Sequence, residues 1–250
     1  MNIRRNEIVT LVNQKGKVSF QELKDHFPNV SDMTLRTDLK CLDQERLLIR
    51  VHGGAKSLEA ISGNDDYLSR RFLKNTEEKK IIAQKSIALL QENKTIFIDS
   101  GSTTTYLSRL FPNQKNIIYT SGLTCATELA KLTAPKVCIT GGVINHNSLS
   151  VNGFQGIDYL KNINFDIAFI GVTRYSHKTG FTCESAEDAE LKRAVISKAD
   201  TVIVLMDSSK VNINGTYTIC DLKEVDTVVS DSKLPIEFIE KCKLEGVEVI

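Results

Sequence analysis

The chain has 250 residues, of which 41% are hydrophobic and 25% are charged, and its formal net charge is +1. This composition supports two modest domains with cores of their own, and it excludes a disordered chain and a uniformly basic, histone-like protein. Residues 1–56 hold ten lysines and arginines against seven acidic residues, whereas residues 57–250 hold twenty-two against twenty-four. A mildly basic head followed by a mildly acidic body suits a DNA-binding region joined to a second domain.

The six cysteines are far apart, with no C-x-x-C pair and no histidine cluster near them. We expect free thiols in a reducing cytosol, without disulfides and without a metal site. The chain shows neither the apolar core of a signal peptide nor an apolar run of the ~20 residues that a membrane helix needs. We therefore expect a cytoplasmic protein that has no membrane partner.

Two short helices are predicted first. In residues 4–14 apolar residues have the i, i+3, i+4 spacing of one buried helix face, and Gly16 ends the pattern. Ser19 lies three residues before Glu22, which is the spacing of a capping box and predicts the start of a second helix. That helix must end before Pro28, because proline cannot extend it.

A third helical pattern begins at Ser31, a natural N-cap, and runs to about Glu45. Its leucines at positions 35, 39 and 42 must face a core, and Asp38 lies towards that buried side. The opposite face carries Met33, Arg36, Thr37 and Lys40. This face suits a major groove, where arginine binds guanine or phosphate and threonine contacts a base edge or methyl group. An ordinary solvated helix face explains this helix equally well.

The segment after this helix favours DNA binding. Residues 47–56 predict two short strands that turn near Gly53 and Gly54, with basic side chains along the ribbon. A hairpin directly after a recognition helix is the wing that contacts backbone phosphate or a neighbouring groove. We therefore expect a winged helix-turn-helix over residues 1–58. Its candidate DNA-binding residues are Ser31, Met33, Thr34, Arg36, Thr37, Lys40, Arg50, His52, Gly53 and Lys56.

Residues 59–75 are predicted to link the head to the body. Small and polar residues suggest a hinge, and a charged run over residues 70–74 follows it. A helix is expected to begin near Thr76, whose hydroxyl can cap it. The second domain is therefore expected to span residues 76–250.

From residue 95 the chain alternates apolar, β-rich runs with helical stretches. The predicted strands are residues 95–99, 116–120, 136–140, 166–170, 201–205 and 227–230. Such alternation predicts an α/β domain with a largely parallel sheet that helices cover on both faces. Ligands of such sheets bind at the carboxyl ends of the strands.

The first of these strands runs into Asp99 and then into an unbroken run of glycine and hydroxyl residues, 100–105, that opens a helix. Free N–H groups, a positive helix end and hydroxyls are what a phosphate group requires. A well-capped strand–helix turn is the alternative, although the run is longer than capping needs. Because neither a G-x-x-x-x-G-K-[ST] nor a G-x-G-x-x-G motif is present, we expect no nucleotide hydrolysis and no cofactor.

The other predicted strands also end in glycine or hydroxyl residues, and if they are neighbours their ends converge on one cleft. There Lys210 would supply a cation for a phosphate group, and Asp99 would accept hydrogen bonds from sugar hydroxyls. A solvated lysine is the alternative for Lys210. The candidate effector-binding residues are Asp99, Ser100, Gly101, Ser102, Thr103, Thr104, Thr120, Ser121, Gly141, Gly142, Gly171, Arg174 and Lys210.

Two sets of residues resemble the DeoR family of regulators of sugar metabolism. In the head these are Val30-Ser31-x-x-Thr34-Leu35-Arg36-x-Asp38-Leu39-x-x-Leu42 and Leu48-x-Arg50-x-His52-Gly53-Gly54-Ala55. In the body they include Asp99-Ser-Gly-Ser-Thr-Thr104, Thr120-Ser121, Gly141-Gly142, Glu187-x-x-Glu190-Leu-Lys192-Arg193 and Asp207-Ser-Ser-Lys210. Two departures are Thr37, where the family usually has a basic residue, and Thr173-Arg174, where relatives commonly have Asp-Gly.

The resemblance implies a sensor domain with a fold like that of ribose-5-phosphate isomerase. It also implies that a phosphorylated sugar binds there and changes the affinity of the head for double-stranded operator DNA. The expected role is a transcriptional regulator, a repressor of a sugar-utilisation operon. Because a single winged helix covers little DNA, we expect a homodimer or homotetramer.

A sugar-phosphate isomerase with an accessory DNA-binding head is the rival hypothesis. Aldose–ketose isomerisation needs a carboxylate base beside the substrate carbon. Glu187 and Glu190 are the candidates, but they lie in a helical pattern rich in surface charge, among Glu184, Asp188, Lys192 and Arg193. The loop over residues 171–174 lacks an acidic pair, so we expect no catalytic residue and no enzyme. A third possibility, a pure interaction module, predicts no salt-dependent DNA binding.

Overall fold

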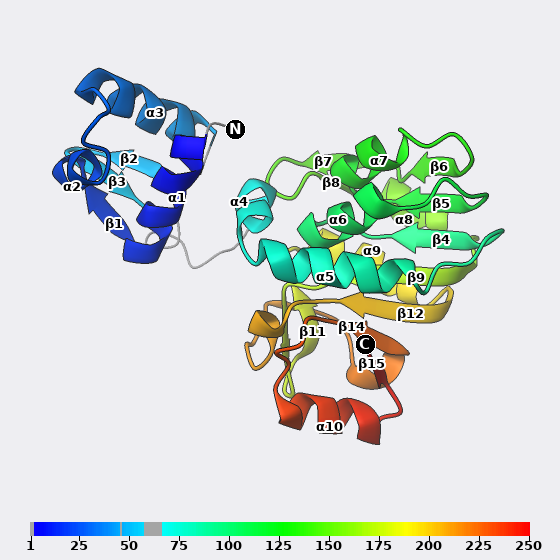
Figure 1. Cartoon of the computed structure of the whole chain (residues 1–250). Coiled ribbons are helices and arrows are strands. Elements are labelled where there is room, and N and C mark those ends of the chain that lie inside the picture. Colours follow the sequence, from blue (N-terminus) through cyan, green and yellow to red (C-terminus); the bar gives the residue numbers. More distant parts are fainter. Residues whose placement is uncertain (1–2, 46, 58–66) are drawn as a thin grey trace. The chain divides into compact units, whose positions relative to one another are not determined.

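The computed structural model describes residues 3–45, 47–57 and 67–250. It divides into two compact units, residues 1–70 and 71–250 (Figure 1). Residue 58 of the predicted head and residues 59–66 of the predicted linker lie outside the described residues. From Leu68 to Leu73 the chain forms helix α4, which the polar composition of the linker did not predict. The boundary between the two units falls inside this short helix.

The N-terminal unit is a winged helix-turn-helix, as predicted. Its elements are α1 (Ile3–Lys15), β1 (Lys17–Ser19), α2 (Phe20–His26), α3 (Asp32–Gln44), β2 (Ile49–Val51) and β3 (Gly54–Lys56). The sheet order is β1-β3-β2, and both pairings are antiparallel. The hairpin of β2 and β3 is the predicted wing, whereas β1 was not predicted because only one of its three residues is apolar.

The predicted caps fix where the second and third helices begin. The Ser19 hydroxyl accepts a hydrogen bond from the Glu22 amide at 3.1 Å, and the Ser19 amide donates to the Glu22 carboxylate at 2.8 Å. These two bonds form the capping box that the sequence predicted. At the start of α3, the Ser31 hydroxyl accepts from the Thr34 amide at 3.2 Å.

Ion pairs and a small core hold α3 against α1. The three leucines of α3 are buried, as their spacing predicted. Asp38, also buried, accepts from Arg4 at 2.7 Å and from Arg5 at 2.8 Å. Burial alone would raise the pKa of the Asp38 carboxyl, but the two arginines hold it below its ordinary value. The pairing therefore stabilises the folded head at neutral pH, and this contribution is lost as the pH falls through the folded-state pKa.

The C-terminal unit contains a parallel sheet of seven strands, in the order β15-β14-β12-β9-β4-β5-β6. The strands are β4 (Thr95–Ile98), β5 (Ile117–Thr120), β6 (Lys136–Ile139), β9 (Phe165–Gly171), β12 (Ala199–Leu205), β14 (Thr227–Val229) and β15 (Glu248–Val249). All neighbouring pairs are parallel. The six predicted strands are all present, and the two-residue β15 is an addition that no apolar run indicated.

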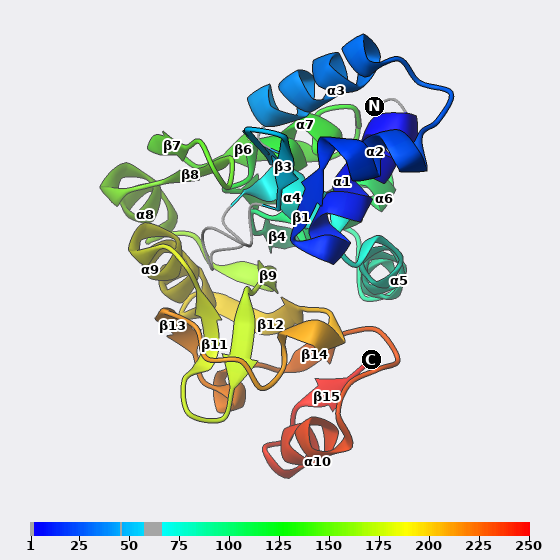
Figure 2. The same cartoon turned by 90° about the vertical axis from the view of Figure 1, so that its left-hand side faces the viewer.

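Helices cover both faces of this sheet, as predicted. They are α5 (Thr76–Ile87), α6 (Ser102–Leu110), α7 (Leu123–Leu129), α8 (Phe154–Leu160), α9 (Ala186–Ile196) and α10 (Ile236–Leu244). Alternate strand residues face opposite ways, so that Ile96 and Ile98 pack with α5, α6 and α7 while Phe97 packs with α8, α9 and α10. Figures 1 and 2 show α5 and α9 on opposite sides of the sheet.

Two smaller sheets and two 3-10 turns were not predicted. They are the hairpin β7 (Val143–Asn145) and β8 (Ser150–Asn152), the antiparallel sheet β10 (Arg174–Ser176), β11 (Gly180–Cys183) and β13 (Tyr217–Cys220), and the turns η2 (Ser208–Lys210) and η3 (Leu222–Glu224). The strands are three or four residues long and mix polar with apolar residues, so they lack the apolar runs that marked the large sheet.

The start of α5 differs from its prediction. The N-cap is Asn75, in the left-handed region at φ +49°, and its side chain makes no capping bond. The Thr76 hydroxyl instead donates to the Phe72 carbonyl of α4 at 3.2 Å. The prediction that Thr76 caps this helix is therefore wrong, because Asn75 occupies the N-cap position and Thr76 is already the first residue of the helix.

Among the described residues, no helix is both long and apolar enough to span a bilayer. All six thiols are free. Cys125, Cys183, Cys220 and Cys242 are buried, and the other two are half-buried.

The two wing glycines predict different mutational effects. A Cβ at Gly54 would overlap the Val18 carbonyl of β1, whereas a Cβ at Gly53 would meet open space, in a left-handed conformation at φ +79°. We expect Gly54→Ala to separate β3 from β1 and to speed amide exchange over residues 17–19 and 54–56. Gly53→Ala, the control, should only strain its own turn, at a cost of about 1–2 kcal/mol. Equal effects of the two substitutions on exchange in β1 would contradict this packing.

Candidate DNA-binding surface and effector site

The outer face of α3 presents the side chains that the helical periodicity placed there. Met33, Arg36, Thr37 and Lys40 are all exposed, and Met33 is 75% exposed. The Arg36 guanidinium lies over the Phe20 ring of α2, 4.4 Å from its centroid, a cation–π contact that limits the positions the guanidinium samples. The Thr37 hydroxyl donates to the Met33 carbonyl at 2.9 Å, which leaves its lone pairs outward.

The wing is tied to the end of α3. The Arg50 amide donates to the Asp43 carboxylate of α3 at 3.0 Å, and the hairpin pairs Arg50 with Ala55. Arg50 and His52 are exposed, and Lys56 is half-buried. The structure therefore places the exposed face of α3 and the basic ribbon in one compact unit.

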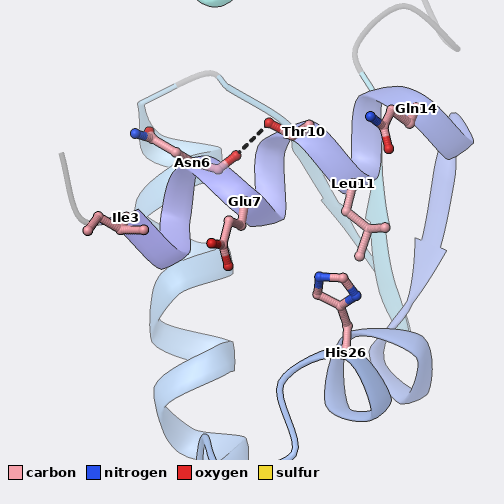
Figure 3. Close-up of a pocket in the computed structure, with 7 residues that line it drawn as sticks. All are labelled: Ile3, Asn6, Glu7, Thr10, Leu11, Gln14 and His26. Carbon is pink, nitrogen blue, oxygen red and sulfur yellow. Dashed lines mark hydrogen bonds between the residues drawn. The ribbon is translucent and has the colours of Figure 1, made fainter.

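The head also has a surface hollow that no residue of α3 lines. It is lined by residues of α1 and by His26 of α2 (Figure 3). Its lining residues are Ile3, Asn6, Glu7, Thr10, Leu11, Gln14 and His26. None of them belongs to the predicted DNA-binding set.

In the body, the candidate effector residues lie along one edge of the sheet. The strands β12, β9, β4, β5 and β6 are consecutive neighbours and parallel, so their carboxyl ends meet at the same edge. From β4 the chain winds outwards through β5 and β6, and then returns to β9 on the other side of β4. Asp99 after β4 and Gly171 at the end of β9 therefore flank the topological switch point, the usual ligand position in such sheets.

The hydroxyls at the start of α6 are only partly used in hydrogen bonds within the protein. Thr104 and Thr105 donate to the Gly101 carbonyl at 3.0 and 2.6 Å, within the first turn of α6, and no side chain caps this helix at its N-cap, Gly101. Ser102 and Thr103 are buried at 5% and 4% exposure, and no hydrogen bond joins their hydroxyls to any described residue. The run thus contains a structural part and a part with unused hydrogen-bonding capacity.

A buried ion pair lies at the switch point. The Lys192 ammonium of α9 is 2.6 Å from the Asp99 carboxylate and donates to the Gly171 carbonyl at 2.6 Å. The Gly171 amide donates to the same Asp99 oxygen at 2.9 Å. The other Asp99 oxygen, Oδ1, is buried without a hydrogen-bond partner. Burial alone would lower the pKa of the Lys192 ammonium, but the Asp99 carboxylate holds it above its ordinary value.

The description of Lys192 as a surface charge is therefore wrong. Its side chain is only 7% exposed. Helical spacing could not reveal this burial, because the compensating carboxylate lies far away in the sequence and meets Lys192 only when α9 packs on the sheet. Glu187 and Glu190, the candidate catalytic bases, are exposed, and Glu187 accepts a hydrogen bond from Ser185 at 2.8 Å.

The remaining predicted cations differ in their surroundings. Lys210 is half-buried, and its ammonium donates to the Val172 carbonyl at 2.6 Å, so it lies at the carboxyl end of β9. Arg174 begins β10, where it lies 3.4 Å from the Glu184 carboxylate and donates to the Asn214 carbonyl at 3.2 Å. The charge of Arg174 is thus balanced beside the small antiparallel sheet.

Of the predicted glycine pair after β6, Gly142 has a structural function, whereas a Cβ at Gly141 would meet open space. Gly142, at φ +138°, lies against the Asn152 carbonyl of β8, where a Cβ would overlap the backbone. Thr120 ends β5 and Ser121 follows it. Both are buried, and the Ser121 carbonyl accepts from the Val151 amide at 2.7 Å. The β7–β8 hairpin is therefore fastened over the ends of β5 and β6.

This hairpin supplies polar residues that the sequence patterns did not indicate. Ser150 and Asn152 are buried, and both donate to the Asp188 carboxylate of α9, Ser150 at 3.0 Å. A cavity of about 370 Å³ opens beside Asn152, between the hairpin and the start of α9. No sequence signal could have found this group, because its partners come from two elements that were not predicted to meet.

Models of known sequence families match both the N-terminal and the C-terminal unit. Residues 4–60 match the DeoR-like helix-turn-helix domain, and residues 74–232 match the DeoR C terminal sensor domain. The chain is 30% identical to the HTH-type transcriptional regulator GolR of Listeria innocua, over 98% of this chain and 96% of that one. It is 29% identical to the putative aga operon transcriptional repressor of Escherichia coli O157:H7, over 99% and 92% of the two chains.

Two further similarities complete the comparison. The glycerol-3-phosphate regulon repressor of Escherichia coli K12 is 29% identical, over 95% of this chain and 93% of that one. Among solved structures, ribose 5-phosphate isomerase A of Methanocaldococcus jannaschii superposes on 55% of each chain, with a TM-score of 0.42 and 17% identity.

The buried pair of Asp99 and Lys192 predicts a large loss of stability when only one of its two charges is removed. Lys192→Met leaves the Asp99 carboxylate buried without its cation, which should cost about 3–5 kcal/mol of unfolding free energy. The double variant Asp99→Asn/Lys192→Met removes both charges and should recover most of that loss. Differential scanning calorimetry of the full chain measures both effects.

Lys161→Met is the matched control, since Lys161 forms an exposed pair with Asp158. It should cost no more than about 1 kcal/mol. A Lys192→Met variant as stable as this control, or a double variant no better than Lys192→Met, would contradict the importance of the pair.

Proposed function

Because this chain belongs to the DeoR family of transcriptional regulators, we propose that it represses a sugar-utilisation operon and that a phosphorylated sugar changes its affinity for operator DNA. The exposed face of α3 with Arg36, Thr37 and Lys40, beside a basic wing, carries the DNA-binding part of this proposal. Arg36 and Thr37 are suited to base edges, and Arg50 and Lys56 to phosphate groups. Since Thr37 stands where the family usually has a basic residue, this helix would contact the DNA phosphate backbone with fewer cations.

The switch-point group carries the effector part. The hydroxyls of Ser102 and Thr103 and the N–H groups at the start of α6 are suited to phosphate oxygens, with Lys210 at the neighbouring strand end as a cation. The free oxygen of Asp99 is suited to a sugar hydroxyl, because an ionised carboxylate only accepts hydrogen bonds. One relative is named for the glycerol-3-phosphate regulon, which supports a phosphorylated ligand.

Binding at this site and binding to DNA are coupled only if the ligand distinguishes two states of the protein. A sugar phosphate weakens operator binding when it prefers the arrangement that binds DNA poorly. We propose relief of repression, and an assembly of two or four chains that places two winged helices on successive half-sites. The relatives are named as regulators, and Glu187 and Glu190 lie exposed, so we propose no isomerase activity.

The recognition helix predicts the effect of Arg36→Ala. This substitution should weaken binding to an operator selected from random duplexes by about 1–3 kcal/mol, because one bidentate base contact is lost. Lys15→Ala, which removes an exposed cation from the C-terminal end of α1, is the control and should leave the affinity unchanged. Fluorescence anisotropy at two salt concentrations measures both variants. Unchanged affinity and unchanged footprints for Arg36→Ala would remove Arg36 from the interface.

The effector site predicts which small molecules stabilise the protein. A thermal-shift assay tests this, since a ligand of the native state raises the melting temperature. The compounds are ribose 5-phosphate, fructose 6-phosphate and glycerol 3-phosphate, each compared with its unphosphorylated counterpart. At least one phosphorylated compound should stabilise the chain without being turned over, and its counterpart should not. If none does, or if ribose 5-phosphate is isomerised, the effector proposal fails.

Thr103→Val keeps the shape of the side chain and removes the hydroxyl. It should weaken binding of the stabilising compound about 10-fold or more, because a hydrogen bond to a charged group is lost. Thr127→Val on α7, where the hydroxyl donates only to the Leu123 carbonyl, is the control. Unchanged calorimetric affinity in Thr103→Val would remove this hydroxyl from the site.

A further inference from the structure

Asn75 joins the candidate effector edge to the segment that leads to the DNA-binding head. It lies between α4 and α5 in a left-handed conformation that few residues other than glycine adopt. At the N-cap position an asparagine side chain ordinarily accepts from its own helix, and this one does not. Its amide group instead donates to the Asp207 carboxylate at 2.8 Å and to the Ser209 hydroxyl at 2.9 Å. The Asn75 amide nitrogen thus donates to two adjacent acceptors on the loop that follows β12.

That loop, residues 207–210, is also fixed at the carboxyl edge of the sheet. Lys210 at its end donates to the carbonyl of Val172, directly after β9, and the Ser208 amide donates to Asp231 at 2.9 Å. Asp207 is 1% exposed. Burial would raise the pKa of Asp207, but Lys210, Ser209, Lys79 and Asn75 hold it below its ordinary value. Asp207 therefore remains an ionised acceptor for Asn75, within three residues of the cation proposed to meet the phosphate group.

Helix α4, which precedes Asn75 in the chain, is also held by contacts with the C-terminal unit. The buried ammonium of Lys79 donates to the carbonyls of Arg71 and Lys74, at the end of α4. Phe72 of α4 packs edge-on against Tyr106 of α6, with ring centroids 6.2 Å apart. The boundary between the two units falls inside α4, so these contacts hold the end of α4 on the chain segment that leads to the head.

We infer that Asn75 is a positioning residue that transmits the state of the Asp207–Lys210 loop to α4, and through it to the connection with the DNA-binding head. The inference rests on the proposed function for its biological meaning, but its physical content does not need a ligand. A ligand that draws Lys210 away from the Val172 carbonyl shifts Asp207 and Ser209, and thereby the two acceptors of Asn75.

Hydrogen exchange of the full chain, without DNA or sugar, tests the mechanical link. Asn75→Gly keeps the left-handed backbone and removes the amide, and should speed exchange over residues 68–74 about fivefold, the factor that one ordinary hydrogen bond is worth. Lys210→Ala removes the bond that holds the other end of the loop, and it should speed exchange over residues 68–74 by a similar factor. The double variant should exceed neither single variant, because both break one chain of contacts.

Two further variants separate this link from a general loosening. Asn93→Gly makes the same replacement at another left-handed asparagine, at φ +59°, and should leave residues 68–74 unchanged. Aspartate also tolerates the left-handed conformation, but Asn75→Asp replaces the amide donor by an acceptor that faces Asp207. This variant should therefore speed exchange over residues 68–74 as Asn75→Gly does. The inference is overturned if Lys210→Ala leaves α4 unaffected, if the effects of Lys210→Ala and Asn75→Gly multiply, or if only the glycine variant responds.

The regulatory consequence has its own readout. The probes are the three phosphorylated compounds tested above, and the one that stabilises the wild-type chain is titrated against operator complexes. Asn75→Gly should keep its calorimetric affinity for that compound within about twofold, yet lose most of the change in operator affinity, because coupling is a separate free energy. Full retention of that change would overturn the inference. If no compound binds, the proposed effector class fails, while the exchange experiment still decides the link.

Discussion

The charge pair of Asp99 and Lys192 fixes the centre of the C-terminal unit. It joins the end of β4, the end of β9 and the helix α9, three elements that are separated in the chain and that meet only in the folded state. A buried pair of this kind contributes little net stability compared with apolar residues, but it is costly to break. It therefore specifies where α9 docks, and it holds the backbone of Gly171 still while one oxygen of Asp99 is left for another donor.

A feature of the fold could be predicted from the sequence when the residues that form it lie close together in the chain. The six strands of the large sheet were predictable because each is a run of apolar, mostly β-branched residues, and the starts of α2 and α3 were predictable because Ser19 and Ser31 cap within three residues. The strands β1, β7, β8, β10, β11 and β13 were missed because they are short and depend on partners elsewhere in the chain. The burial of Lys192 and the group around Asp188 were missed for the same reason.

Within the candidate site, the sequence indicated the edge of the sheet but not the division of roles along it. Thr104 and Thr105 stabilise the first turn of α6, while Ser102 and Thr103 keep their hydroxyls unused, although all four belong to one uniform run. Arg174 was a possible site cation, and the structure pairs it with Glu184 instead. Such assignments depend on distances between residues far apart in sequence, which no local pattern encodes.

The contact between Arg36 and the Phe20 ring bears on how a duplex would be read. A long side chain that is free in solution loses rotamer entropy when a partner immobilises it. With its guanidinium already resting on an aromatic face, Arg36 has less of that freedom to lose on docking. A lysine in its place would bring the same charge without the planar stacking, so the two basic residues would not be interchangeable here. Operator recognition by this helix would thus depend on an aromatic residue of α2, outside the recognition helix itself.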